Sequence, residues 1–150
     1  MTFYFAYGSL MDLNFVKDLG VNYQKAQSGI IKNYQFKTNI RDSINPEYGY
    51  ANIVQKENHL VEGVIMQIPN NSLSFLDSYE GYPFLYRREK LEVYLSNTNN
   101  KILAWTYIGE LNSSTNENLL LSKVQKERII NGFKFLSIEY KKYITKTFFL

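Results

Sequence analysis

The sequence predicts an α+β fold in which a mixed, mostly antiparallel β-sheet forms a small barrel-like core with flanking helices. Three observations predict it. Apolar runs of strand length alternate with polar turns over much of the chain, aromatic residues make up 16% and are mostly tyrosines, and the helical patterns are short or lie near the C-terminus. No repeat, linker or low-complexity segment divides the 150 residues, so we expect residues 1–150 to form a single domain.

A strand, a glycine turn and a short helix are predicted to begin the chain. Residues 3–7 are aromatic apart from one alanine, and this strand pattern ends at Gly8. Asp12 is suited to cap a helix over residues 12–19, and Gly20 is suited to end it. A glycine turn that leads into a helix presents backbone N–H groups that have no helical partner.

The middle of the chain is predicted to be mostly strand. Apolar β-branched and aromatic residues indicate three strands, at residues 34–40, 49–54 and 60–68. Polar residues indicate turns between them, at residues 41–47 and 55–58. These strands supply most of the expected sheet.

A short helix and a hairpin are expected next. The helix covers residues 71–79, with Ser72 as its N-cap, and ends at Glu80 because glycine and proline follow. The hairpin has strands at residues 86–96 and 102–108, joined by a turn at residues 97–100.

Two helices are predicted to end the chain. Ser114 and Glu117 have the spacing of a capping box, so we expect a helix from Ser114 to near Gly132. A second helix is expected over residues 137–146.

Charge and hydropathy argue against several partners. The 17 basic and 14 acidic residues give a net charge of +3, which is small and scattered for a nucleic-acid surface. The densest basic group is interpreted as the solvated face of the last helix and comprises Lys134, Lys141, Lys142 and Lys146. No run approaches the ~20 apolar residues of a membrane helix, and the N-terminus lacks secretory features. We therefore expect a cytoplasmic protein that binds neither membrane nor nucleic acid.

The cysteine and histidine counts exclude several kinds of chemistry. There is no cysteine, and His59 is the single histidine. A Cys–His nucleophile pair, a disulfide framework and thiolate or multi-imidazole metal sites are therefore impossible. We expect no metal and no cofactor, and chemistry that depends on carboxylates, hydroxyls, phenols, amines, guanidinium and backbone groups.

Two segments are candidates for a functional site. The turn over residues 7–10 could bind a carboxylate or phosphate through consecutive N–H groups, although such a glycine turn can be purely structural. Glu80 stands between a helix and a turn in a stretch rich in tyrosine, where burial would raise its pKa toward neutrality and let it accept and return a proton. The alternative for Glu80 is a solvated glutamate at a helix end.

Taken together, the two segments resemble the gamma-glutamylcyclotransferase family, and the resemblance covers nearly the whole chain. Its specificity lies in the pairing of an N-terminal Tyr-Gly-Ser-Leu turn with a distant Glu-Gly. The matching residues are Phe5-Ala6-Tyr7-Gly8-Ser9-Leu10, Leu76-Asp77-Ser78-Tyr79-Glu80-Gly81-Tyr82, Tyr86-Arg87-Arg88, Tyr107 and the C-terminal stretch 129–143.

The resemblance implies a small γ-glutamyl substrate that is cyclised to 5-oxoproline with release of an amino acid or amine. It assigns Glu80 as the catalytic acid/base. The residues it places at the substrate are Tyr7, Gly8, Ser9, Leu10, Asn52, Tyr86 and Tyr107. The backbone at Gly8, Ser9 and Leu10 would bind the α-carboxylate. The donors to the oxyanion would come from Tyr86, Tyr107 or the backbone at Gly8. Tyr7 would form a wall of the pocket. Core rings with satisfied hydroxyls are the alternative for the tyrosines.

Some questions stay open from sequence. The Gly81-Tyr82-Pro83 segment looks nearer to the γ-glutamylamine branch of the family, whereas the C-terminal helices look nearer to the γ-glutamyl-amino-acid branch, so the leaving amine is undecided. The protein could be a monomer or a homodimer. A non-catalytic module that binds a carboxylate-bearing metabolite is the alternative function, and nucleic-acid binding is a third. The segment 148–150 is expected to pack on the body or to contact a partner.

Overall fold

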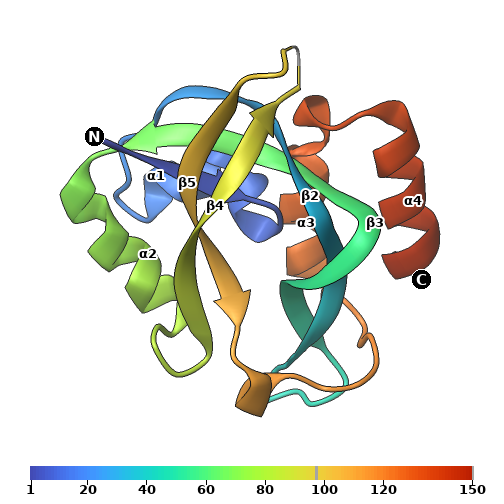
Figure 1. The fold of residues 1–150 in the computed structure, drawn as a ribbon. Coiled ribbons are helices and arrows are strands. Elements are labelled where there is room, and N and C mark those ends of the chain that lie inside the picture. Colours follow the sequence, from blue (N-terminus) through green and yellow to red (C-terminus); the bar gives the residue numbers. More distant parts are fainter. Residues whose placement is uncertain (97, 150) are drawn as a thin grey trace.

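The computed structural model of the protein describes residues 1–96 and 98–149, and its centre is a closed five-stranded barrel (Figure 1). The strands follow the order β1-β3-β2-β4-β5 around the barrel, and they are β1 (Thr2–Ala6), β2 (Gln24–Arg41), β3 (Gly49–Ile68), β4 (Tyr86–Leu95) and β5 (Lys101–Gly109). All neighbours are antiparallel except β1 and β5, whose parallel pairing at Tyr4 and Trp105 closes the barrel. The predicted fold class is confirmed.

The long antiparallel pair β2–β3 corrects one predicted turn. Residues 55–58 do not separate two strands, because β3 continues through them. The register passes from Lys32 opposite Leu60 to Tyr34 opposite Gln55, so the extra residues of β3 form an irregularity that faces Asn33. Asn33 has a left-handed φ of 63° and accepts a hydrogen bond from the Asn58 N–H at 3.2 Å. Pairing with β2 on both sides of this point maintains one strand where the local sequence indicates a turn.

The first two helices begin and end near the predicted residues. A 3-10 turn (η1, Ser9–Met11) leads into α1 (Leu13–Asp18), and the Asp12 carboxylate accepts hydrogen bonds from the N–H groups of residues 14 and 15. A second 3-10 turn (η2, Asn70–Ser72) leads into α2 (Leu73–Glu80). Ser72 makes no side-chain cap, because it is itself in helical conformation. Gly81 ends α2 in the left-handed conformation, with a φ of 68°.

The C-terminal part departs from the expected capping box. Ser114 and Glu117 do not start a helix, because a 3-10 turn (η3, Leu111–Ser113) is followed by an irregular segment that is hydrogen-bonded to the end of β2. Thr38 holds that segment, donating its hydroxyl to the Leu119 carbonyl at 2.7 Å. Helix α3 (Lys123–Asn131) begins only after Ser122, whose hydroxyl caps it. A further turn (η4, Phe133–Phe135) precedes α4 (Ile138–Phe148).

The core fills the barrel and the space under the outer helices. Its largest fully buried side chains include Phe5, Phe36, Ile53, Ile65 and Met66. Phe148 packs edge-on against Phe36 and Phe149 stacks on Phe133, so both rings pack on the body of the protein. Leu150, the last residue of the 148–150 segment, lies outside the described residues, as does Asn97 in the predicted hairpin turn. No helix in the described part of the chain is long and apolar enough to span a membrane.

Candidate functional site

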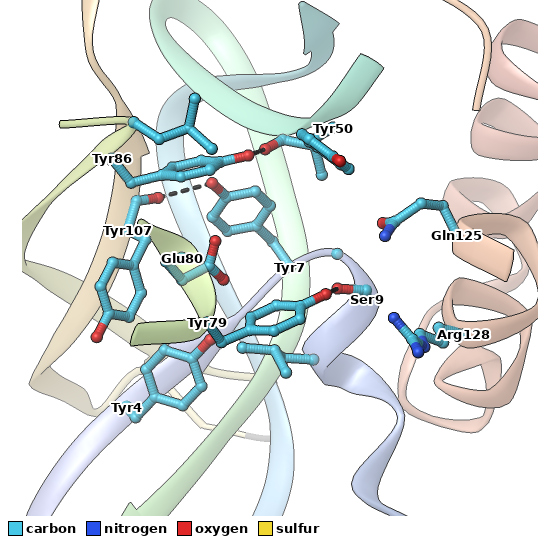
Figure 2. Close-up of a pocket in the computed structure, with 14 residues that line it drawn as sticks. Tyr4, Tyr7, Ser9, Tyr50, Tyr79, Glu80, Tyr86, Tyr107, Gln125 and Arg128 are labelled. Atoms are coloured by element: carbon cyan, nitrogen blue, oxygen red, sulfur yellow. Dashed lines mark hydrogen bonds between the residues drawn. The ribbon is translucent and has the colours of Figure 1, made fainter. Parts of the chain in front are cut away.

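A pocket of about 300 Å³ opens at one end of the barrel, between the end of α2 and the inner face of α3 (Figure 2). The turn after β1 forms part of its floor and contributes Gly8, Ser9 and Leu10. Its walls are largely aromatic and include Tyr4, Tyr7, Tyr50, Tyr79, Tyr86 and Tyr107. The pocket therefore gathers residues from both segments that the sequence singles out.

Glu80, the last residue of α2, is in the wall of this pocket. Burial raises the pKa of its carboxyl to about 8. Two neighbouring phenols also have shifted pKa values. Burial is the larger cause and the Glu80 charge is the next, and together they raise the pKa of Tyr4 and of Tyr7 well above the usual value. No hydrogen bond or ion pair reaches the Glu80 carboxylate from the residues that the structure describes. A carboxyl of this kind can exchange a proton near neutral pH.

The turn after β1 places backbone N–H groups at the pocket. Its first internal hydrogen bond runs from the Met11 N–H to the Gly8 carbonyl at 3.0 Å, so the N–H groups of Ser9 and Leu10 precede the bonded part of the turn. Glycine is needed at position 8 for space, since its φ is −128° and a Cβ there would lie 2.8 Å from the Cβ of Ala51. This close approach brings the turn against β3.

Three tyrosine hydroxyls of the pocket have their hydrogens committed to protein acceptors. Tyr7 donates to the Tyr107 carbonyl, Tyr86 donates to the Ala51 carbonyl, and Tyr107 donates to Asp77 Oδ1, each at 2.6 Å. Figure 2 shows the Tyr107 hydroxyl directed away from the pocket centre. Tyr86 and Tyr107 are thus placed as walls, with their donor hydrogens used elsewhere.

Other hydroxyls in the pocket keep a hydrogen to donate. Ser9 Oγ and the Tyr79 hydroxyl lie 2.9 Å apart and share one hydrogen bond, which leaves one of their two hydrogens free. The Tyr4 hydroxyl has no hydrogen-bond partner among the described residues, and Figure 2 shows it directed toward Glu80 and Tyr79. Sequence reasoning missed Tyr4 and Tyr79 as site residues, because nothing local distinguishes them from core rings.

Helix α3 contributes two polar side chains to the opposite wall. Gln125 and Arg128 stand three residues apart, on one face of the helix, and both line the pocket across from Glu80 (Figure 2). The Arg128 guanidinium carbon lies 3.6 Å from the centre of the Phe15 ring. The sequence predicts both residues to be helical, but no local pattern shows which other element this helix faces.

An ion pair behind the pocket fixes α2 to the barrel. Arg88 in β4 contacts both carboxylate oxygens of Asp77, through Nε at 2.7 Å and Nη2 at 3.2 Å. The Tyr107 hydroxyl bonds the same carboxylate, and the Arg88 guanidinium lies between the rings of Tyr82 and Trp105. This bidentate pair holds the helix that ends at Glu80.

The structure places Asn52 outside this pocket. It is 1% exposed, donates from Nδ2 to Asn39 Oδ1 at 3.0 Å and accepts from the Gly109 N–H at 2.8 Å. It lines a separate pocket, and its hydrogen bond to Gly109 supports the end of β5. Within the described part of the chain, no group of three or more Asp, Glu or His side chains could hold a metal ion.

Comparison with known proteins identifies the family. Solved structures share the fold. One is described as a gamma-glutamyl cyclotransferase, with 21% identity, a TM-score of 0.80 and coverage of 98% of this chain and 87% of that one. Another is YkqA from Bacillus subtilis, with 23% identity, a TM-score of 0.83 and coverage of 97% of this chain and 53% of that one. A gamma-glutamyl cyclotransferase specific to glutathione from yeast is more distant, with 13% identity, a TM-score of 0.65 and coverage of 97% of this chain and 93% of that one. The chain spans about half the length of YkqA. Comparison with curated protein sequences gave no match. The family described as gamma-glutamyl cyclotransferase, AIG2-like, matches residues 4–136, and the chain belongs to this family.

Proposed function

We propose that the protein is a cofactor-independent cyclotransferase that converts the γ-glutamyl group of a small molecule to 5-oxoproline and releases the attached amine or amino acid. The observation that carries the proposal is the state of Glu80. Its carboxyl lines a pocket of about 300 Å³, has a pKa raised to about 8 by burial and is free of protein partners among the described residues. Family membership supports the substrate class. We expect the enzyme to act in the cytoplasm.

One carboxyl can serve both halves of this reaction. The α-amine of the substrate attacks its own γ-carbonyl carbon, and the new C–N bond closes a five-membered ring. Glu80 accepts the proton that this nitrogen loses. The tetrahedral intermediate then collapses, the bond to the leaving amine breaks, and the protonated Glu80 returns the proton to the departing nitrogen. Holding the folded-back conformer lets an intramolecular attack replace a bimolecular one.

The remaining groups of the pocket bind and stabilise. The N–H groups of the turn at Gly8, Ser9 and Leu10 bind the α-carboxylate. The oxyanion needs donors whose hydrogens are free. Tyr4 and the Ser9–Tyr79 pair meet this condition, whereas the hydroxyl hydrogens of Tyr86 and Tyr107 are engaged elsewhere.

A pair of tyrosine variants tests the source of the oxyanion donor. We expect Tyr4→Phe to lower kcat by about 10²-fold, since removal of one oxyanion donor has an effect of this order. Tyr86→Phe is the matched control and should retain kcat within about 10-fold, because its hydroxyl bonds the Ala51 carbonyl. Steady-state kinetics on a γ-glutamyl substrate measures both. The opposite ranking would show that Tyr86 is the donor.

The direct test of the function is product analysis. The protein is incubated with γ-glutamyl amino acids and γ-glutamylamines, and 5-oxoproline is quantified by chromatography against enzyme-free controls. We expect turnover of at least one compound. If calorimetry instead shows saturable binding and no 5-oxoproline forms over hours, the protein is a binding module for carboxylate-bearing metabolites. Salt-sensitive retention on heparin beyond that expected for a net charge of +3 would favour nucleic-acid binding.

A further inference from the structure

The α3 wall of the pocket carries two polar side chains that the proposed proton transfers do not use. Gln125 is 8% exposed, and Arg128 is partly buried. They line the pocket on the side opposite Glu80 (Figure 2). A molecule that fills the pocket would therefore contact both side chains.

Arg128 differs from the two arginines at the start of β4. Arg88 is held by Asp77, and Arg87 pairs with Glu89 at 2.6 Å. Arg128 has no ion pair among residues 1–96 and 98–149, and its guanidinium packs on the Phe15 ring. A guanidinium fixed in this way presents several N–H donors in a rigid fork suited to a carboxylate.

Gln125 extends this donor surface. It precedes Arg128 by three residues, so the two side chains share one face of α3. No hydrogen bond engages its side-chain amide among the described residues, although its backbone N–H is capped by Ser122. The amide therefore has two N–H donors available next to the guanidinium.

We propose that Gln125 and Arg128 bind a carboxylate on the leaving group, and that the preferred substrates are γ-glutamyl conjugates of α-amino acids or peptides. This inference rests on the proposed cyclotransferase function. A γ-glutamyl amino acid carries two carboxylates, and the pocket offers two separate sets of donors: the N–H groups of the turn at residues 8–10, and the side chains of α3. A neutral amine would leave Arg128 without an anion, and a cationic amine would be repelled by it.

The test compares two substrates that differ only in that carboxylate, γ-glutamyl-alanine and γ-glutamyl-alaninamide. In the wild-type protein we expect kcat/KM to favour the acid by about 30-fold, an effect in the range of charge-assisted hydrogen bonds. In Arg128→Gln this ratio should fall below about 3, and Arg128→Lys should be intermediate because lysine retains the charge without the fork. Lys123→Gln, on the exposed side of α3, removes the same charge and should retain the wild-type ratio.

A binding measurement separates this proposal from the one it rests on. Calorimetry with Glu80→Gln protein measures the affinity of both compounds without turnover, and the Arg128→Gln change is then added to that background. A preference for the acid that disappears with Arg128 supports the inference even if no 5-oxoproline is ever formed. If Arg128→Gln lowers the affinity for both compounds equally, Arg128 binds the α-carboxylate instead. If the preference for the acid survives the substitution, Arg128 does not recognise the leaving group. Either result overturns the proposal, and thermal unfolding of each variant confirms that the fold is retained.

Discussion

Replacing Glu80 by glutamine is expected to lower kcat by about 10³-fold, because general acid–base catalysis by a positioned group contributes effects of this order. Glutamine has nearly the same shape and cannot accept the proton of the attacking amine or return one to the leaving nitrogen. No hydrogen bond or ion pair of the Glu80 carboxylate is lost within the described residues. The assay is 5-oxoproline formation under saturating substrate.

The same variant has a predicted stability signature that controls for misfolding. The Glu80 pKa is raised from 4.5 to about 8, so the folded protein binds this proton more tightly than the unfolded chain does. Wild-type stability should therefore fall as pH rises from about 4.5 through 8, and the glutamine variant should escape this loss. At pH 9 we expect Glu80→Gln to be more stable by ~2–4 kcal/mol, from about 1.4 kcal/mol per unit of pKa with part of the effect reduced by solvent. An inactive variant that is less stable at pH 9 would indicate structural damage instead.

Replacing Gly63 by alanine is expected to destabilise the protein by about 3 kcal/mol, the upper part of the range for overpacking. A Cβ at this position of β3 would lie 2.2 Å from the Ala6 carbonyl oxygen and 2.8 Å from Phe5 Cζ. The carbonyl belongs to the end of β1, so relief of the clash has to move the backbone that leads into the turn at residues 7–10. We therefore expect a lower kcat/KM as well.

Gly20 provides the comparison for this substitution. A Cβ there meets nothing within 4 Å, but the backbone has a φ of +91°. Gly20→Ala should destabilise by about 1–2 kcal/mol, the cost of a left-handed alanine, and should retain activity. Urea unfolding of both variants measures the difference. Equal destabilisation would contradict the close approach of Gly63 to β1.

Local signals predicted those parts of the fold that local interactions determine. Asp12 caps α1 and Gly81 ends α2 as expected, because a cap and a left-handed stop depend on residues within one turn. The capping-box spacing of Ser114 and Glu117 failed because the Ser114 hydroxyl bonds the Glu110 carbonyl and the following residues pair with β2. The polar residues 55–58 stay within β3 for a similar reason, since β2 pairs with β3 at both ends of this stretch, at Gln55 and at Leu60.

The residues of the candidate site likewise fall into two groups, those that local sequence signals indicate and those that only the folded chain brings together. Glu80 and the turn at residues 7–10 were proposed from sequence because a carboxylate among tyrosines and a glycine turn are recognisable in short stretches. Gln125 and Arg128 were missed, because their place opposite Glu80 depends on the packing of α3 near Met11 and Asp12, far away in the sequence (Figure 2). The direction of a tyrosine hydroxyl likewise depends on distant acceptors, such as Asp77 for Tyr107, which lie on other elements.

The pH dependence of kcat/KM for 5-oxoproline formation tests most directly the claim that Glu80 carries the proton. The account predicts that kcat/KM rises with pH as a carboxyl with a pKa of about 8 ionises, and that the residual activity of Glu80→Gln lacks this ionisation. Ionisation of the substrate amine is common to both proteins, so comparison of the two profiles removes it. A wild-type profile that is flat from pH 6 to 9, or that matches the profile of the glutamine variant, would contradict the account.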